Sequence, residues 1–278
     1  MSDENPIRAC VLGFPVSHSL SPKLHGFWLK KYGINGAYTS MAVTPEHLPQ
    51  ALDTLMERGF AGCNMTLPLK EIALSSMDEH DESCLMSGAV NTVVFRGGKK
   101  TGYNSDGFGF MESLKAQHPG WDGARVVILG AGGAARGIIA SLRGAGATHF
   151  VLVNRTREKA EKVISAFKMK EATIVDWENR ASALEGATLL VNCTSLGMMG
   201  NPPMEIDLSF LPKAAAVCDI VYRPLTTPLL AEARRRGNPA VEGLPMLLHQ
   251  GRLGFQHWFG VDPAVTPELY NEMRKDIA

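Results

Sequence analysis

The residues best suited to chemistry in this 278-residue chain belong to a glycine-rich loop that can bind phosphate. The loop, residues 130–135, fits the pattern G-x-G-x-x-A and lies between an apolar run and a stretch with helical spacing. Its glycines permit a tight turn and the close approach of a pyrophosphate, while a helix N-terminus supplies N–H groups and partial positive charge. Although a glycine turn can serve packing alone, its flanking elements favour a dinucleotide site. The predicted cofactor-binding residues are Gly130, Ala131, Gly132, Gly133, Ala134 and Ala135.

The loop after the next predicted strand indicates which dinucleotide binds. NAD-binding folds usually carry Asp or Glu about 20 residues beyond the glycines, where the carboxylate binds the ribose 2′-hydroxyl. Residues 123–157 contain no Asp or Glu; the strand is followed by Asn154-Arg155-Thr156-Arg157, with Lys159 close behind. Guanidinium and hydroxyl groups bind a 2′-phosphate, which a carboxylate would repel. The pattern predicts NADP rather than NAD, and a solvated basic loop is the alternative.

Two hydroxyl groups near the start of the chain, those of Ser19 and Ser21, are suited to binding a small carboxylate. The two serines are separated by one residue, so in an extended segment both side chains face the same way. The alternative is that they form a helix N-cap and a loop position with no role in binding.

Lys70 and Asp106 are ionisable residues beside predicted turns. Lys70 follows a strand and a proline, where a single lysine is most simply a solvated surface residue. Asp106 lies in the turn-like string Asn104-Ser105-Asp106-Gly107 and is most simply a helix N-cap. Their positions in the sequence alone do not place them together.

Metal and disulfide chemistry find no support in the sequence. The eight histidines include no HExxH motif and form no cluster with cysteine, so no metal site is predicted. The five cysteines are scattered, odd in number and without a CxxC pair. They are expected to be buried free thiols in a reducing compartment.

Short strands alternate with helices along the chain, which predicts an α/β protein with parallel strands. Thr44 is expected to cap one helix, and Gly33 to end another. A first series comprises strands at 9–12, 37–43, 60–65 and 92–95, with helices at 22–32 and 45–58. A second series comprises strands at 125–129, 150–153, 188–192 and 214–219, with a last long helix at 244–259.

Composition limits the class of protein. The chain has 28 basic and 28 acidic residues and 45% hydrophobic residues, which suits on the order of two domains with a substantial core. A formal net charge of zero argues against a nucleic-acid partner. The polar first residues do not resemble a signal peptide, and no apolar run approaches the roughly 20 residues that span a bilayer. A soluble, cytoplasmic two-domain protein is expected.

Several strings taken together resemble the shikimate dehydrogenase family over nearly the whole chain. Each string by itself is unspecific, but the occurrence of this many strings in one order is specific for the family. They include Ser19-Leu20-Ser21-Pro22, Asn64-Met65-Thr66-Leu67-Pro68-Leu69-Lys70-Glu71, Gly88-Ala89-Val90-Asn91-Thr92, Asn104-Ser105-Asp106-Gly107, the glycine loop with Asn154-Arg155-Thr156, Asn192-Cys193-Thr194-Ser195-Leu196-Gly197-Met198, Asp219-Ile220-Val221-Tyr222-Arg223-Pro224, and Gly243-Leu244-Pro245-Met246-Leu247 leading to Gln250.

The resemblance implies an N-terminal substrate domain, residues 1–107 plus 245–278, and a Rossmann-like NADP-binding domain, residues 108–244. The C-terminal helix would return to the first domain. The implied reaction is the reversible NADPH-dependent reduction of 3-dehydroshikimate to shikimate, on the route to chorismate and the aromatic amino acids.

The family pattern also implies roles for individual residues. Lys70 and Asp106 match the catalytic pair, and a nearby ammonium suits a ketone oxygen that gains negative charge. The implied substrate-binding residues are Ser19, Ser21, Thr66, Lys70, Asn91, Asp106, Tyr222 and Gln250. Implied cofactor-binding residues beyond the glycine loop are Asn154, Arg155, Thr156, Lys159, Ile220 and Gly243.

Two alternatives stay open at this point. One is a quinate/shikimate dehydrogenase with broader use of substrate or cofactor, although its NAD-using forms usually carry an acid after the second strand. The other is a catalytically silent NADP-binding sensor, against which the joint presence of Lys70, Asp106 and Gln250 speaks. Leu69 and Ser105 depart from commoner family residues beside the catalytic pair. The expected partner is a small molecule, and the expected oligomeric state is a monomer or homodimer.

Overall fold

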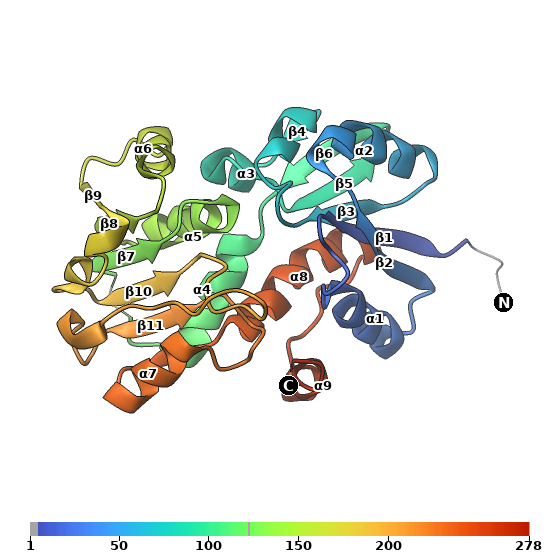
Figure 1. Cartoon of the computed structure of the whole chain (residues 1–278). Helices are drawn as coiled ribbons and strands as arrows, with labels where there is room; N and C mark the ends of the chain where they lie inside the picture. The colour runs from blue at the N-terminus through green and yellow to red at the C-terminus, as the bar shows by residue number, and fades with distance from the viewer. Residues whose placement is uncertain (1–4, 122, 278) are drawn as a thin grey trace. The chain divides into compact units, whose positions relative to one another are not determined.

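The computed structural model describes residues 5–121 and 123–277, which form two compact α/β units (Figure 1). The first unit contains residues 5–106 and 250–273, and the second contains residues 107–249 and 274–277. Within the described residues, each unit is built on a six-stranded sheet. The two-unit α/β architecture predicted from the alternation of strands and helices is confirmed.

The sheet of the first unit is mixed and has the strand order β2-β1-β3-β5-β6-β4. β1 pairs in parallel with β2 and β3, whereas β5 is antiparallel to β3 and β6. A wholly parallel arrangement is therefore wrong here, because Gly97 and Gly98, both with positive φ, turn β5 directly into β6. The strands are β1 (Ile7–Gly13), β2 (Gly36–Ala42), β3 (Gly62–Met65), β4 (Glu79–His80), β5 (Thr92–Arg96) and β6 (Lys99–Tyr103).

Helices cover this sheet with apolar side chains at helical spacing. Leu48, Leu52 and Leu55 of α2 belong to one buried cluster with residues of β1 and β3. α1 ends at Gly33, whose left-handed conformation lets its amide bond the preceding turn, as predicted. Thr44 was expected to cap the next helix, but its side chain makes no capping bond and a 3-10 turn intervenes. The helices are α1 (Ser21–Tyr32), α2 (Leu48–Glu57), α3 (Glu82–Ser87) and α9 (Pro267–Arg274).

The sheet of the second unit is parallel throughout and has the order β12-β11-β10-β7-β8-β9. This is the strand order of dinucleotide-binding Rossmann folds, with the change of direction between β7 and β10. The four strands predicted for this unit are confirmed; β9 and β12 lacked a clear pattern. The strands are β7 (Arg125–Leu129), β8 (His149–Val153), β9 (Ala172–Val175), β10 (Leu189–Asn192), β11 (Ala216–Asp219) and β12 (Ala240–Val241).

Both faces of this parallel sheet are buried. Val126 and Ile128 of β7 pack in a cluster with α5, and Val127 and Leu129 pack in another with α7, because side chains alternate along a strand. Figure 1 shows α5 and α7 on opposite sides of the sheet. The helices are α4 (Asp106–Gln117), α5 (Gly133–Gly144), α6 (Arg157–Ala166), α7 (Pro228–Arg236) and α8 (Gly243–Phe259), the last of which contributes its residues from Gln250 onward to the first unit.

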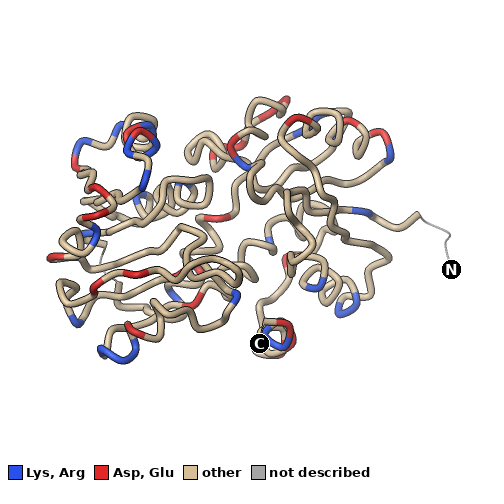
Figure 2. Tube along the Cα trace, in the orientation of Figure 1, with Lys and Arg blue, Asp and Glu red and all other residues tan. Residues whose placement is uncertain are grey.

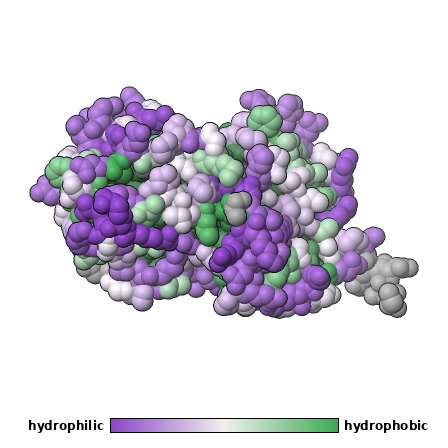
Figure 3. Space-filling view, turned by 60° about the horizontal axis from the view of Figure 1, so that its bottom comes forward, coloured by the Kyte–Doolittle hydropathy of each residue, from purple (hydrophilic) through white to green (hydrophobic). Residues whose placement is uncertain are grey.

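On the face drawn in Figure 3, hydrophilic residues predominate and hydrophobic residues form small patches. No helix in the described part of the chain combines the length and the apolar character that crossing a bilayer requires.

Candidate active site

A buried ion pair joins Lys70 to Asp106. The Lys70 ammonium donates to both carboxylate oxygens, at 2.8 Å to Oδ1 and 2.7 Å to Oδ2. The Asp106 side chain is 1% exposed and that of Lys70 is 15% exposed. Interpreting Lys70 as a solvated lysine is therefore wrong. A buried carboxylate needs this kind of partner, since an unpaired charge is costly away from water.

The strand pairing of the first sheet brings the two residues together. Lys70 lies on the loop after β3, and Asp106 begins α4 shortly after β6. Both strands pair with β5 and run antiparallel to it, so their carboxyl ends meet at the level of Thr92. The predicted N-cap role of Asp106 is wrong, because Asp106 is the first residue of the helix and its own amide donates to Asn104 Oδ1 at 3.0 Å.

Asn91 holds the second side of the Asp106 carboxylate. Its Nδ2 donates to Asp106 Oδ1 at 2.9 Å. Its Oδ1 accepts from the Thr92 hydroxyl at 3.0 Å and from the amide and hydroxyl of Ser105 at 2.9 and 3.1 Å. Because three donors surround that oxygen, the amide group cannot turn over, and a ligand can meet only the remaining N–H of Asn91.

Ser19 and Ser21 are arranged differently from the extended segment that was predicted. Leu20 between them has helical backbone angles, and Ser21 is the first residue of α1. The Ser21 amide donates to Ser19 Oγ at 3.3 Å, so the chain turns into the helix at this point. The loops that hold Ser19 and Thr66 follow the adjacent parallel strands β1 and β3, and the Phe14 amide donates to the Leu67 carbonyl at 3.0 Å.

The remaining predicted substrate residues lie on other elements. Gln250 is half-buried within α8, and Tyr222 is half-buried after β11. Binding of the substrate by Ser19, Ser21, Thr66, Tyr222 and Gln250 stays a prediction.

The glycine loop has the backbone geometry that a phosphate site needs. Gly130 has φ of 103°, and a Cβ there would lie 3.2 Å from the backbone of Cys193, so only glycine suits the turn. A Cβ at Gly132, the N-cap of α5, would meet no described atom within 4 Å. The first helical bond runs from Arg136 N to Gly132 O at 3.1 Å, which leaves the amides of residues 133–135 unused by the helix. These amides and the open side at Gly132 fit a pyrophosphate.

The turn between β8 and α6 and the start of α6 carry several basic residues, which are coloured blue in Figure 2. Arg155, Thr156 and Lys159 are exposed, and Asn154 holds the turn by donating to the Thr156 carbonyl at 2.8 Å. Arg157, by contrast, pairs with Glu161 and Asp176 at 3.2 and 2.8 Å. Arg155 and Lys159 therefore fit the predicted 2′-phosphate better than Arg157 does.

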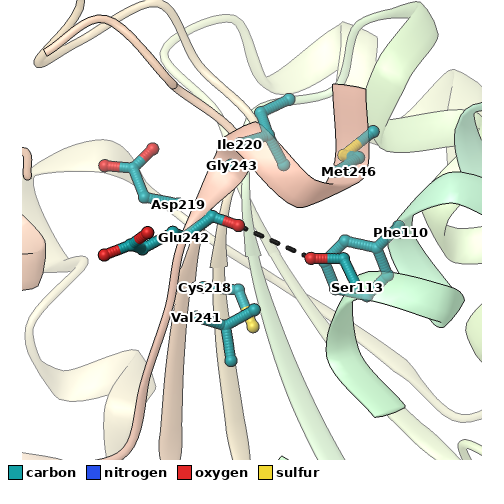
Figure 4. Close-up of a pocket in the computed structure, with 9 residues that line it drawn as sticks. All are labelled: Phe110, Ser113, Cys218, Asp219, Ile220, Val241, Glu242, Gly243 and Met246. Carbon is teal, nitrogen blue, oxygen red and sulfur yellow. Dashed lines mark hydrogen bonds between the residues drawn. The ribbon is translucent and has the colours of Figure 1, made fainter. Parts of the chain in front are cut away.

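Ile220 and Gly243 lie against each other at a shallow recess of the second unit (Figure 4). A Cβ at Gly243 would come within 2.6 Å of the Ile220 carbonyl oxygen, so glycine is needed where α8 begins. Nearby, Ser113 Oγ donates to the Glu242 carbonyl at 3.5 Å. The structure brings these two predicted cofactor residues together, but their contact with a nicotinamide stays a prediction.

Asp219 fixes the segment that contains Ile220 and Tyr222. Its buried carboxylate accepts from Thr227 Oγ1 at 2.6 Å, from Asn192 Nδ2 at 2.9 Å and from the Val221 amide at 3.1 Å. Burial raises the pKa of Asp219 from 3.8 to about 6, although these hydrogen bonds lower it. The carboxylate serves to anchor the backbone that follows β11.

Comparison with known proteins identifies the family. Residues 11–93 match the family model described as the shikimate dehydrogenase substrate binding domain. Residues 112–199 match shikimate / quinate 5-dehydrogenase, and residues 243–267 match the shikimate 5′-dehydrogenase C-terminal domain. The shikimate dehydrogenase (NADP(+)) of Rhodospirillum rubrum is 50% identical over 267 residues, which cover 94% of either chain. The chain belongs to the shikimate dehydrogenase family.

Two solved dehydrogenase structures are similar to this chain over nearly its whole length. The Thermus thermophilus shikimate 5-dehydrogenase, solved with NADP(H) and shikimate, has a TM-score of 0.85 and 38% identity, and the match covers 98% of this chain and 100% of that one. A quinate dehydrogenase of Corynebacterium glutamicum, solved with NAD, has a TM-score of 0.87 and 28% identity, with 98% and 99% covered. The predicted resemblance to the shikimate dehydrogenase family is confirmed.

The sequence did not predict the polar strand residues that are linked by hydrogen bonds to Asn91 and, through Asn91, to Asp106. Tyr38, Asn64 and Thr92 lie on β2, β3 and β5 and connect to Asn91 through hydrogen bonds. The available signal was a polar residue within a strand expected to be buried, as at Asn64 and Thr92. In the described part of the chain, no group of three His, Cys, Asp or Glu side chains could hold a metal ion.

Proposed function

We propose that the chain catalyses the reversible NADPH-dependent reduction of 3-dehydroshikimate to shikimate, on the route to chorismate and the aromatic amino acids. The observation that carries this proposal is the buried Lys70–Asp106 pair, closed at 2.7 Å, in a chain of this family. The curated relatives bear the name shikimate dehydrogenase (NADP(+)), which supports both the substrate and the cofactor.

The Lys70–Asp106 ion pair stabilises negative charge on the substrate and transfers a proton. NADPH, when bound, would supply a hydride to the ketone carbon. The ketone oxygen then gains negative charge, which the Lys70 ammonium stabilises through space and by hydrogen bonding. The pair provides the proton that converts this oxygen into a hydroxyl, and Asp106 keeps the ammonium oriented toward it. In the reverse direction the pair receives that proton.

Polar groups of the first unit hold the substrate. The hydroxyls of Ser19 and Ser21 bind its carboxylate, and Thr66, Asn91 and Gln250 contact its hydroxyl groups. Asn91 acts as a donor, because its oxygen is already surrounded by Thr92 and Ser105. Such groups discriminate strongly, since an analogue that lacks a hydroxyl leaves a buried partner unpaired. Residues 1–107 and 245–278 make up this substrate domain.

Residues 108–244 hold the cofactor. The amides after Gly132 bind the pyrophosphate, and Arg155, Thr156 and Lys159 bind the 2′-phosphate, with Asn154 shaping their turn. Ile220, Tyr222 and Gly243 line the place of the nicotinamide. The basic turn carries no carboxylate to accept the 2′-hydroxyl of NAD.

The setting of this activity is the cytoplasm, with a monomer or homodimer as the functional form and no nucleic acid as partner. The five cysteines are free thiols, and four of them are buried, which supports a reducing compartment.

Product identification tests the proposal. The purified protein is incubated with NADPH and 3-dehydroshikimate, and the product is identified by mass spectrometry after chromatography. Shikimate is expected, formed in one-to-one proportion with oxidised cofactor. Binding of NADPH without any product would support the sensor instead and would overturn the proposal.

A further inference from the structure

A line of buried and part-buried hydrogen bonds runs across the first sheet and ends on the Asp106 carboxylate. Tyr38 Oη lies 2.5 Å from Asn64 Oδ1, and Asn64 Nδ2 lies 3.0 Å from Thr92 Oγ1. Thr92 Oγ1 is 3.0 Å from Asn91 Oδ1, whose amide nitrogen is 2.9 Å from Asp106. The line therefore links β2, β3 and β5 to the first residue of α4.

Each link in this line has one possible direction. The Asn64 amide nitrogen donates to both the Asn91 carbonyl and Thr92 Oγ1, so its side-chain oxygen must face Tyr38 and accept. Since Thr92 Oγ1 accepts from Asn64, its own proton points to Asn91 Oδ1. All donors thus point toward Asp106, and hydrogen bonds aligned in this way polarise one another.

The far end of the line is shielded from water and remains a donor. The imidazole of His25 stacks on the Tyr38 ring with 3.9 Å between centroids and 5° between planes. Burial, together with Cys10 and Cys63 nearby, raises the pKa of Tyr38 well above its usual value, so the phenol keeps its proton. Tyr38, Thr92, Asn91 and Asp106 are each less than one-tenth exposed.

We propose that Thr92 is a positioning residue of the reaction, the link through which Tyr38 and Asn64 orient Asn91 and thereby the Asp106 carboxylate that holds Lys70. This proposal rests on the proposed function of the Lys70–Asp106 pair. Thr92 is fully buried and contacts the reacting atoms only through Asn91. The hydroxyl group of Thr92, rather than the volume of its side chain, orients Asn91.

A comparison of Thr92→Val and Thr92→Ser separates the hydroxyl from the packing. Valine keeps the shape but removes one hydrogen bond on each side, so kcat for shikimate oxidation should fall about tenfold, with a smaller change in KM. Serine restores the hydroxyl and should keep kcat within about twofold of wild type. Thr188→Val is the matched control, because the Thr188 hydroxyl also donates and accepts but bonds only the Arg125 backbone in the second unit.

A double-mutant cycle with Asn91→Ala distinguishes positioning from a general structural role. If Thr92 acts through Asn91, adding Thr92→Val to Asn91→Ala should change kcat by less than about twofold. An equal tenfold loss in both backgrounds, or unchanged kcat in Thr92→Val alone, would overturn the proposal. An inactive wild-type protein would instead overturn the proposed function.

Tyr38→Phe provides a second route if Thr92→Val does not fold. This change removes only the phenol oxygen and preserves the stacking on His25. We expect kcat to fall about threefold, and the loss to disappear when Asn91→Ala is present. A Tyr38→Phe protein with wild-type kcat, or with the same loss in both backgrounds, would contradict the proposed line of orientation.

Discussion

Lys70 and Asp106 show how the chemistry of single residues depends on burial. A lysine ammonium in water attracts a carboxylate only weakly, whereas this pair is almost withdrawn from solvent and doubly hydrogen-bonded. The contact with Asn91 further limits how the carboxylate can turn. The ammonium is thus held in one place before any substrate arrives, which is the arrangement that stabilises a developing oxygen charge.

Replacing Lys70 by alanine tests this role. We expect kcat to fall by about 10² to 10⁴, the range typical of acid–base groups, with the KM for shikimate changing much less. Steady-state kinetics in the oxidation direction measure both constants. Lys100→Ala is a suitable control, because Lys100 pairs with the exposed Asp53 in the same unit. An effect on KM alone would move Lys70 from catalysis to binding.

His25 makes stability depend on pH. Burial lowers its pKa to about 3, whereas a histidine in the unfolded chain titrates near its usual 6.5. The unfolded state therefore binds a proton that the folded state excludes, and stability is lost as pH falls from about 6.5 toward about 3.

His25→Phe should remove this pH dependence and keep the stacking on Tyr38. Between about pH 8 and about pH 5, wild type should lose on the order of 2 kcal/mol of unfolding free energy relative to the variant. Both ring nitrogens of His25 are buried without a hydrogen-bond partner among the described residues, so the phenylalanine is also tolerated at neutral pH. Denaturant unfolding at the two pH values measures the difference, and an identical difference at both would contradict the argument.

Among the elements, the turn between β8 and α6 is the one that we expect to distinguish NADP from NAD. Its exposed Arg155 is available to a phosphate, whereas Arg157 is engaged by two carboxylates. We expect Arg155→Gln to raise the KM for NADP⁺ about tenfold to a hundredfold while leaving the KM for NAD⁺ within about twofold, because a charge-assisted bond is lost. Arg157→Gln is the matched control and should have a smaller effect. Equal losses with both cofactors would contradict the assignment.

Some elements could be predicted from the sequence, and others could not. Strands such as 125–129 and the helix ending at Gly33 were predictable, because apolar spacing and capping are local signals. The reversal of β5 and the approach of Lys70 to Asp106 were not, because both depend on strand pairing between distant segments. The turn at Ser19 was not predicted, because a leucine at position 20 does not by itself indicate the helical backbone angles that the structure shows there. Resemblance to the family, rather than periodicity, suggested the pair.

For the molecule as a whole, a net charge of zero conceals an uneven distribution of acidic residues along the chain. The chain has 28 acidic residues, yet none lies in residues 123–157, the segment that contains the glycine loop and the basic turn. One α/β unit carries this segment, and the other carries the Lys70–Asp106 ion pair. We therefore expect activity with one specific combination of cofactor and substrate, NADP⁺ with shikimate.

The most direct test is to measure kcat/KM for wild type with shikimate and quinate, each with NADP⁺ and with NAD⁺. The shikimate–NADP⁺ pair should exceed both NAD⁺ pairs by about tenfold or more, since we expect Arg155 and Lys159 to bind the 2′-phosphate, and quinate should react little. Comparable or faster reaction with NAD⁺ would contradict the role of the basic turn. No turnover of any pair would contradict the assignment of this site as the active site of a dehydrogenase.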